Sequence, residues 1–175
     1  MSECRPEGLI QVYTGNGKGK TTAALGLALR ASGSGFRVCF IQFMKGTLDC
    51  GEHKFVKRFP GFEIIQPAKT SYWDQPAADR LEDAARALEL SRQAVSSGKY
   101  DMVILDEIMT AYHSGLLALD DVVGLIKVKP APLELVLTGR GAPPEVIELA
   151  DLVTEMREIK HPFASGIPAR RGVEF

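Results

Sequence analysis

Short apolar runs recur along the chain at intervals that suit the strands of a buried sheet. Several are apolar at consecutive positions, which is typical of strands in a parallel sheet covered by helices on both faces, because a half-exposed strand would alternate. The predicted strands are Leu9–Tyr13, Val38–Phe43, Phe62–Ile65, Met102–Leu105, Leu133–Leu137 and Leu152–Met156.

The segments between these runs show the spacing of helices. The clearest lies between Pro76 and Ser97, where Pro76 suits a first turn and Gly98 suits a left-handed stop. Its apolar positions at helical spacing are Leu81, Ala84, Ala85, Leu88 and Val95.

Three further helices are predicted at Thr21–Ser32, Asp120–Lys127 and Pro143–Leu149. Strands and helices therefore alternate along the chain, which predicts an α/β fold with a doubly wound, mostly parallel sheet and helices on both faces. The stretch Phe59–Gln75 is richer in proline, glycine and aromatic residues than its surroundings and is predicted to be a long, partly irregular loop region, which in compact domains is more often functional than accidental.

Composition narrows the class of protein. The 175 residues suit one domain, predicted here to span positions 1–175, and 45% hydrophobic with 25% charged residues is the balance of a globular chain. A net charge of -1 lacks the basic excess of nucleic-acid-binding proteins. The three cysteines form no CxxC pair, and no apolar run approaches a membrane span. We therefore expect a cytoplasmic protein with reduced cysteines that binds neither nucleic acid nor membrane.

A glycine-rich segment between the first predicted strand and helix is typical of a phosphate-binding loop. It reads TGNGKGKTT over Thr14–Thr22. Its glycines allow backbone amides to face phosphate oxygens, and the helix that begins near Lys20 adds a positive dipole end. Lys20 supplies a charge, and the hydroxyl of Thr21 or Thr22 would reach Mg²⁺. The alternative is a plain glycine turn, to which Gly-Lys-Thr-Thr would be superfluous. The loop glycines are Gly15, Gly17 and Gly19.

The spacing of this loop departs from the common Gly-x-x-x-x-Gly-Lys-Thr form. Counting back from Gly19 places Thr14 where the first glycine is expected, and counting from Gly15 gives a loop that is one residue short. A shortened loop predicts that the triphosphate is held differently from that of a typical ATPase.

Two acids follow the predicted strand Met102–Leu105, and such a site needs one acid there. Because side chains alternate along a strand, Asp106 and Glu107 should point to different sides. One is expected in the metal shell while the other orients neighbouring groups, and which acid does which stays open. The alternative is a strand that ends in solvated acids.

Two arginines have open roles. Arg140 follows Thr138 at the carboxyl edge of the predicted sheet, where it could contact phosphate, a substrate carboxamide or a neighbouring loop, or lie in a solvated turn. Arg30 lies at the far end of the Thr21–Ser32 helix and could contact ligand or simply favour the helix C-terminus.

Five segments together resemble the ATP-dependent corrinoid adenosyltransferases. They read GNGKGKTTAALGLALRASGSGFRV, IQFMKG, VILDE, LTGRGAPPEVIELADLVTEM and KHPFASGIPARRGVEF, and the likeness runs from about Gly8 to Phe175. The resemblance implies a RecA-like P-loop fold and a homodimer. It also implies transfer of the 5′-deoxyadenosyl group of ATP to the cobalt of a reduced corrinoid, with release of triphosphate, in cobalamin biosynthesis or salvage. The acceptor would be cob(I)alamin or cobyrinic acid a,c-diamide.

The resemblance also assigns residues to roles. Glu107 would be the metal-shell carboxylate with Thr21, Arg30 would contact ATP, and Trp73 would pack on the corrin beside Tyr72. Ser71 replaces the family's usual aromatic two positions before this tryptophan. The triphosphate cradle would comprise Asn16, Gly17, Lys18, Gly19, Lys20, Thr21 and Thr22.

The implied chemistry explains why the chain needs no nucleophile of its own. A Co(I) corrinoid is itself a strong nucleophile, so the protein positions two substrates and neutralises the departing triphosphate. We expect Lys20, Thr21 and Glu107 to do this with Mg²⁺ or Mn²⁺, and reduced flavin or a flavodoxin-like protein to donate electrons. The alternatives are a P-loop ATPase or kinase that cleaves at the γ-phosphate, and a non-catalytic nucleotide or corrinoid sensor.

Overall fold

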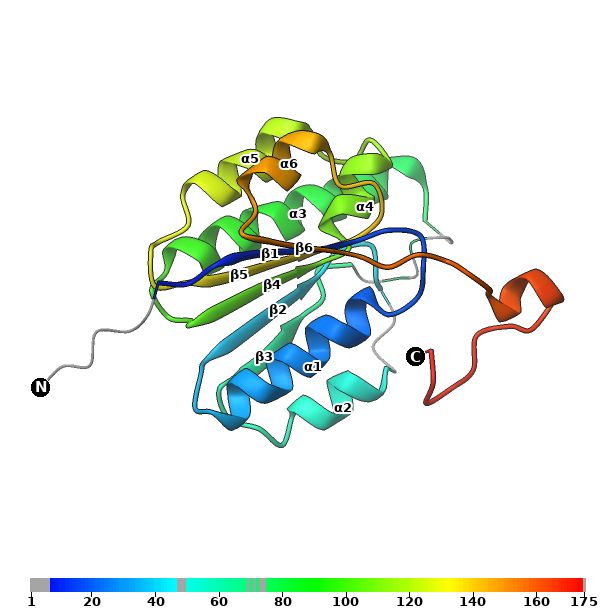
Figure 1. Ribbon diagram of the computed structural model, residues 1–175, viewed down its shortest axis with the longest axis horizontal. Helices are drawn as coiled ribbons and strands as arrows, with labels where there is room; N and C mark the ends of the chain where they lie inside the picture. The colour runs from blue at the N-terminus through cyan, green and yellow to red at the C-terminus, as the bar shows by residue number, and fades with distance from the viewer. Residues whose placement is uncertain (1–6, 47–49, 69, 71, 73–74, 175) are drawn as a thin grey trace, which may run out of the picture.

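The computed structural model describes residues 7–46, 50–68, 70, 72 and 75–174 (Figure 1). Its centre is a six-stranded sheet in the order β3-β2-β4-β5-β1-β6, and every pairing is parallel. All six predicted strands are present, with ends that differ by at most one residue. The strands are β1 Ile10–Thr14, β2 Val38–Gln42, β3 Phe62–Ile65, β4 Met102–Asp106, β5 Glu134–Thr138 and β6 Leu152–Glu155.

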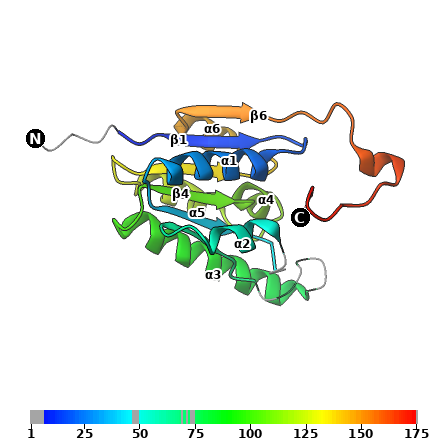
Figure 2. The ribbon, with the colours of Figure 1, turned by 90° about the horizontal axis from the view of Figure 1, so that it is seen from below.

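Helices cover both faces of the sheet, which confirms the predicted doubly wound α/β fold. The helices α1 (Lys20–Gly33) and α2 (Gly51–Val56) lie on one face, and the remaining α-helices lie on the other (Figures 1 and 2). Those remaining helices are α3 Ala77–Ser96, α4 Ile108–His113, α5 Leu119–Lys127 and α6 Pro144–Leu149. The six-residue helices α2 and α4 were not predicted, whereas the equally short α6, which begins with a proline, was.

The helix α1 lies close to the strands because small residues form its contact with the sheet. Three small residues of α1, Ala24, Ala28 and Ala31, pack on Phe40, Val38, Ile104 and Val136, and all of these are buried. Because alanine side chains are short, the helix axis lies near the sheet. The N-terminus of α1 is thereby held over the carboxyl ends of β1, β4 and β5, where open α/β sheets bind ligands.

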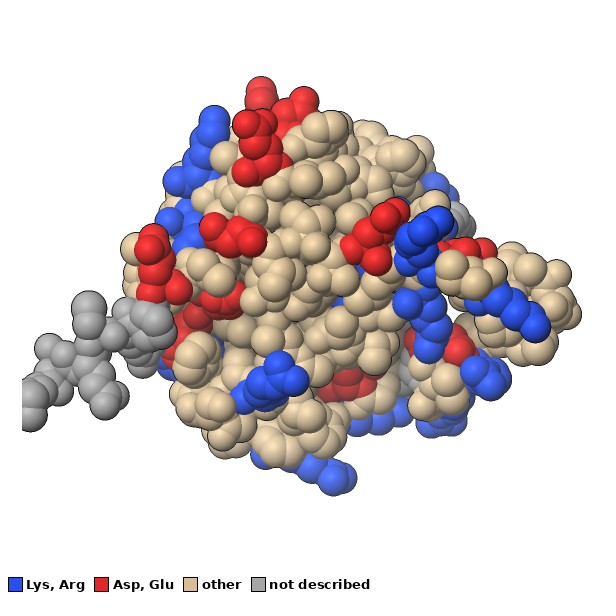
Figure 3. Space-filling view, viewed as in Figure 1, with Lys and Arg blue, Asp and Glu red and all other residues tan. Residues whose placement is uncertain are grey.

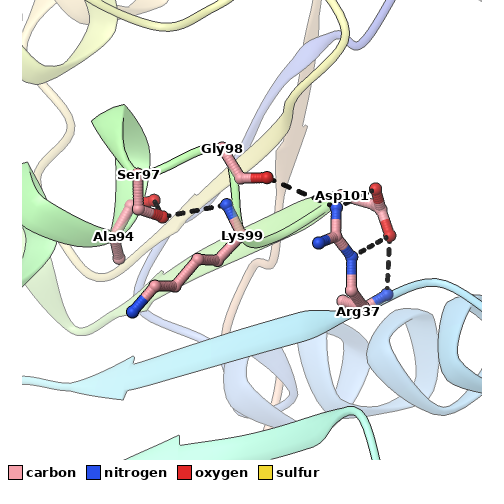
Figure 4. Close-up of polar contacts among 6 residues, drawn as sticks. All are labelled: Arg37, Ala94, Ser97, Gly98, Lys99 and Asp101. Carbon is pink, nitrogen blue, oxygen red and sulfur yellow. Dashed lines mark hydrogen bonds and ion pairs between the residues drawn. The ribbon is translucent and has the colours of Figure 1, made fainter.

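The opposite, amino edge of the sheet is held by a structural ion pair. Arg37 donates from its backbone N–H and its guanidinium to the Asp101 carboxylate at 2.8 to 3.1 Å (Figure 4). The guanidinium also reaches the Gly98 carbonyl, beside a turn in which Ser97 Oγ accepts the Lys99 N–H. These bonds join the starts of β2 and β4 to the end of α3.

The strand β6 and the segment after it are the most exposed part of the fold. All four residues of β6 are exposed, and the chain then leaves the body through the 3₁₀ helix η2 (Pro162–Ser165) and returns toward the phosphate loop (Figures 1 and 2). Large apolar side chains point to solvent here, including Ile159 at 86% and Phe163 at 75% exposure. Several lysine and arginine side chains stand beside acidic ones where this tail departs (Figure 3). None of the described helices is long and apolar enough for a membrane span.

Candidate active site

A cavity of about 840 Å³ lies at the carboxyl edge of the sheet, between the phosphate loop, α1, α2 and the C-terminal tail. It has two chemically different walls. The cationic wall carries Lys18, Lys20, Lys45 and Arg140 beside the loop amides, and three acids, Glu52, Glu107 and Glu174, also line the cavity. The apolar wall carries Leu25, Gly26, Leu29, Phe55, Val56 and Phe62.

Two glycines of the phosphate loop leave room for a neighbouring segment of the chain. A Cβ on Gly15, at φ 97°, would lie 2.4 Å from the Met156 carbonyl oxygen, and one on Gly17 would lie 2.7 Å from that of Arg157. The Gly17 N–H also donates to the Met156 carbonyl at 2.7 Å. The chain that leaves β6 therefore presses on the loop, and the Gly17 amide is already used within the protein.

Lys20 spans the loop from its first helical position. Its side chain is 6% exposed, and Nζ donates to the carbonyl oxygens of Gly15 at 2.7 Å and Gly17 at 2.8 Å. Burial lowers the pKa of Lys20, and the nearby carboxylates of Glu107 and Asp106 oppose that shift. The ammonium group thus lies at the cavity wall, held by groups that a phosphate oxygen can replace.

Asp106 occupies the centre of a buried polar row under the start of α1. Its Oδ1 accepts hydrogen bonds from Thr21 Oγ1 at 2.9 Å and Thr138 Oγ1 at 2.7 Å, and its Oδ2 accepts from Lys45 Nζ at 2.9 Å. Asp106 is fully buried. The structure thus places Asp106, and not Glu107, against the hydroxyl of the phosphate-loop threonine.

Glu107 reaches the same cavity by a different route. It adopts a left-handed conformation at φ 63°, which costs a non-glycine residue about 1 kcal/mol. Its N–H donates to Thr138 Oγ1 at 2.9 Å, and its carboxylate accepts a hydrogen bond from Thr110 Oγ1. The turn directs Glu107 into the cavity while Asp106 stays below α1. Both acids therefore lie beside the phosphate loop.

The donor set suits a hard divalent cation. Thr21, Asp106 and Glu107 offer only oxygen atoms, which Mg²⁺ and Mn²⁺ prefer. Within the described ranges, no group of three or more His, Cys, Asp or Glu side chains could hold a metal by itself. An ion here would therefore complete its shell with water and substrate phosphate, as Mg²⁺ commonly does.

Arg140 lines the cavity together with the phosphate loop. Its backbone N–H donates to Thr110 Oγ1 at 2.9 Å. The preceding Gly139, at φ 136°, has no room for a side chain, because a Cβ would lie 2.5 Å from the Thr110 amide nitrogen. The start of α4 and the end of β5 thus hold Arg140 among the lining residues, as the sheet-edge argument predicted.

Two predicted ligand contacts, Arg30 and Tyr72, do not line the cavity. Arg30 is exposed in the last turn of α1, about 15 Å of helix from Lys20, and it does not line the cavity. Tyr72 lies under the Arg80 guanidinium, 4.6 Å from its ring centroid, in a small pocket beside α3. Trp73 falls outside the described residues. The roles of all three stay predictions.

Several lining residues were missed by the sequence analysis. Glu174 in the tail lies 3.7 Å from Lys18 and accepts hydrogen bonds from Arg170, which lower the pKa of Glu174 to about 2. Lys45 and the apolar residues of α2 were also missed as site residues. No local motif marks these positions, although IQFMKG and the KHPF tail form part of the family resemblance.

Comparisons with known proteins agree with this geometry. The family model "ATP:corrinoid adenosyltransferase BtuR/CobO/CobP" matches residues 6–175. This chain belongs to that family. The corrinoid adenosyltransferase of Pseudomonas aeruginosa is 40% identical over 179 residues, covering 100% of this chain and 88% of that protein. The corrinoid adenosyltransferase of Escherichia coli is 38% identical over 171 residues, covering 96% and 86%.

A solved structure confirms the fold from further away. The KaiC-like protein of Pyrococcus horikoshii aligns with a TM-score of 0.60 at 14% identity, covering 89% of this chain and 76% of that chain. At this identity the likeness concerns the fold alone, and it supports the predicted P-loop, RecA-like architecture of this family member.

Proposed function

We propose that this protein transfers the 5′-deoxyadenosyl group of ATP to the Co(I) centre of a reduced corrinoid. The electron pair of Co(I) forms a bond to the ribose C5′, the C5′–O5′ bond breaks, and its electrons leave with triphosphate. Family membership supports the reaction. The observation that carries it at the site is the Thr21–Asp106 bond beside a cavity with one cationic and one apolar wall.

Each wall has a part in this reaction. Lys20, Lys18 and Arg140 would bind the triphosphate and stabilise its charge as the bond breaks. Thr21, Asp106 and Glu107 would hold Mg²⁺ or Mn²⁺, which when bound neutralises phosphate charge. Leu29 and Phe55, 51% and 46% exposed, offer apolar surface to the flat organic parts of the substrates.

The remaining features of the proposal concern the wider assembly. A homodimer would cover the exposed strand β6 and the apolar side chains of the tail, including Phe163. Trp73 and Tyr72 would contact the corrin, and Arg30 would contact ATP. The protein would work in the cytoplasm in cobalamin biosynthesis or salvage, with reduced flavin or a flavodoxin-like protein as the electron donor.

An anaerobic assay tests this proposal. The protein is incubated with MgATP and cob(I)alamin, cob(I)inamide or reduced cobyrinic acid a,c-diamide, and both products are measured. We expect equal amounts of triphosphate and of a light-sensitive cobalt-carbon product. ADP without a cobalt-carbon product would show a γ-phosphate reaction and would overturn the proposal. Binding of both substrates without turnover would also contradict it.

A further inference from the structure

Lys45 is a cavity-lining cation to which neither the family resemblance nor the motifs assign a role. It follows β2, and its Nζ lies 2.9 Å from Asp106 Oδ2. The lysine side chain is 30% exposed, whereas the aspartate side chain is fully buried. One end of this ion pair therefore faces the cavity, and the other lies under the phosphate loop.

The ion pair with Lys45 adds a third hydrogen bond to the two that Asp106 accepts from threonines. Thr21 and Thr138 donate to one carboxylate oxygen, and Lys45 donates to the other. In P-loop enzymes a carboxylate next to the loop hydroxyl belongs to the metal shell. Here that carboxylate already carries a positive partner, so a divalent cation and the Lys45 ammonium would compete for the same negative charge.

The backbone around Lys45 is shaped to hold it there. Met44 adopts a left-handed conformation at φ 57°, which is unusual for a residue other than glycine. Gly46 touches the loop after β3 so closely that a Cβ would lie 1.5 Å from the Thr70 carbonyl oxygen. A strained residue and a close-approach glycine thus flank Lys45, which is the pattern of a functional segment.

The charge state of Lys45 agrees with this arrangement. Burial by itself would lower the pKa of Lys45, but the adjacent Asp106 carboxylate together with Glu107 and Glu52 outweighs it, so the pKa lies above its usual value. The side chain is therefore an ammonium ion at neutral pH. Its flexible four-carbon stem allows the charge to move while the backbone stays in place.

We infer that Lys45 is a resident cation of the nucleotide site that moves from Asp106 to the substrate triphosphate when a divalent cation binds beside Thr21. This inference rests on the proposed function, because it takes the cavity to be the triphosphate site. Lys45 keeps the buried carboxylate neutralised in the free protein. In the loaded protein it adds a positive charge to the leaving group.

The test uses Lys45→Met and two binding measurements that need neither corrinoid nor turnover. Loss of the ammonium leaves the Asp106 carboxylate without its positive partner. The affinity for Mn²⁺ alone, measured by electron paramagnetic resonance, should therefore rise about 10- to 100-fold. Binding of inorganic triphosphate without metal, followed by calorimetry, should weaken by about the same factor. Adding Asp106→Asn to Lys45→Met should abolish the gain in Mn²⁺ affinity.

Two control variants test whether the effect depends on the positive charge at position 45. Lys45→Arg should retain tight triphosphate binding, because the cation remains. Lys57→Met removes one exposed lysine just after α2 and should change neither measurement. If Lys45→Met matches the unmodified protein in both measurements, Lys45 is a structural ion-pair partner and the inference is overturned, while adenosyl transfer by the unmodified protein would still stand.

A measurement on the unmodified protein covers the case in which Lys45→Met does not fold. The lysine ammonium groups are labelled with ¹⁵N, and the Lys45 signal is identified from its loss in Lys45→Arg. We expect this signal to move when Mg²⁺ and triphosphate are added together. An unmoved signal would contradict the exchange. Failure of the unmodified protein to bind triphosphate at all would instead overturn the proposed function.

Discussion

Two neighbouring rows of side chains on the α1 face of the sheet are equally buried but chemically opposite. They lie two residues apart along the same three strands, β2, β4 and β5. The first row lies under the middle of α1, and the second lies under its N-terminus. The apolar row is Phe40, Ile104 and Val136, and the polar row is Gln42, Asp106 and Thr138, all at 0% exposure.

The difference shows that burial alone does not reveal what a residue does. The apolar row packs against α1 alanines and stabilises the fold. The polar row places a carboxylate against Thr21, and it includes an amide nitrogen, Gln42 Nε2, that has no hydrogen-bond partner within the described residues. A buried polar group without a partner costs about 1–3 kcal/mol, so this row does not serve stability alone.

The largest effect is expected directly above the polar row. Lys20→Ala removes the loop ammonium and should lower turnover about 10²- to 10³-fold through lost charge stabilisation. The melting temperature should change little, because within the described part of the chain Nζ bonds only to loop carbonyls. The anaerobic assay and a thermal melt measure the two quantities. Unfolding of this variant would show that Lys20 stabilises the fold and would contradict its assigned role in the reaction.

The apolar row should show the reverse behaviour. Ile104→Ala leaves a cavity beneath α1 and should lower the free energy of unfolding by about 2–5 kcal/mol, measured by urea denaturation. Activity per folded molecule should stay close to that of the unmodified protein. The milder Ile104→Val should cost about 1 kcal/mol. If Ile104→Ala folded fully but lost turnover, the two rows would not differ in role.

Thr138→Val tests the polar row at constant shape. The change removes the donor to Asp106 and the acceptor for the Glu107 N–H, and it should destabilise the protein by about 1–3 kcal/mol. We also expect a higher Mg²⁺ concentration at half-maximal rate, because both acids lose a positioning contact. The matched control is Thr154→Val on the exposed strand β6, which should stay within about 0.5 kcal/mol. If the Mg²⁺ concentration at half-maximal rate did not change, Thr138 would contribute to stability alone.

The smallest effect is expected at the tail. Glu174→Gln frees Lys18 from a carboxylate and should tighten triphosphate binding by at most about fivefold. Since the folded pKa of Glu174 lies near 2, below its usual 4.5, the tail contact is present above pH 4.5 and is lost only as the pH falls toward 2. The gain should therefore be constant between pH 6 and 8, as measured by calorimetry. A gain that varies over this range would contradict the assigned contact.

The strands, the helices α1, α3, α5 and α6, the phosphate loop and the family could be predicted from the sequence, because each follows from contiguous residues. Apolar runs, helical spacing and the GNGKGKTT loop are local patterns that chain folding preserves. The short helices α2 and α4 show no such pattern, and the sequence LVTE of β6 does not reveal that this strand lies exposed at the sheet edge.

Which groups meet at the site depends on how the chain folds. Thr21 and Asp106 are 85 residues apart in the chain, and Lys45 and Asp106 are 61 apart. The alternation of side chains along a strand could not tell which of Asp106 and Glu107 faces the phosphate-loop threonine. The left-handed backbone at Glu107 directs that side chain into the cavity and leaves Asp106 against Thr21. The tail reaches Lys18 from the other end of the chain. Such contacts depend on strand order and close packing, which the spacing of residues along one chain does not encode.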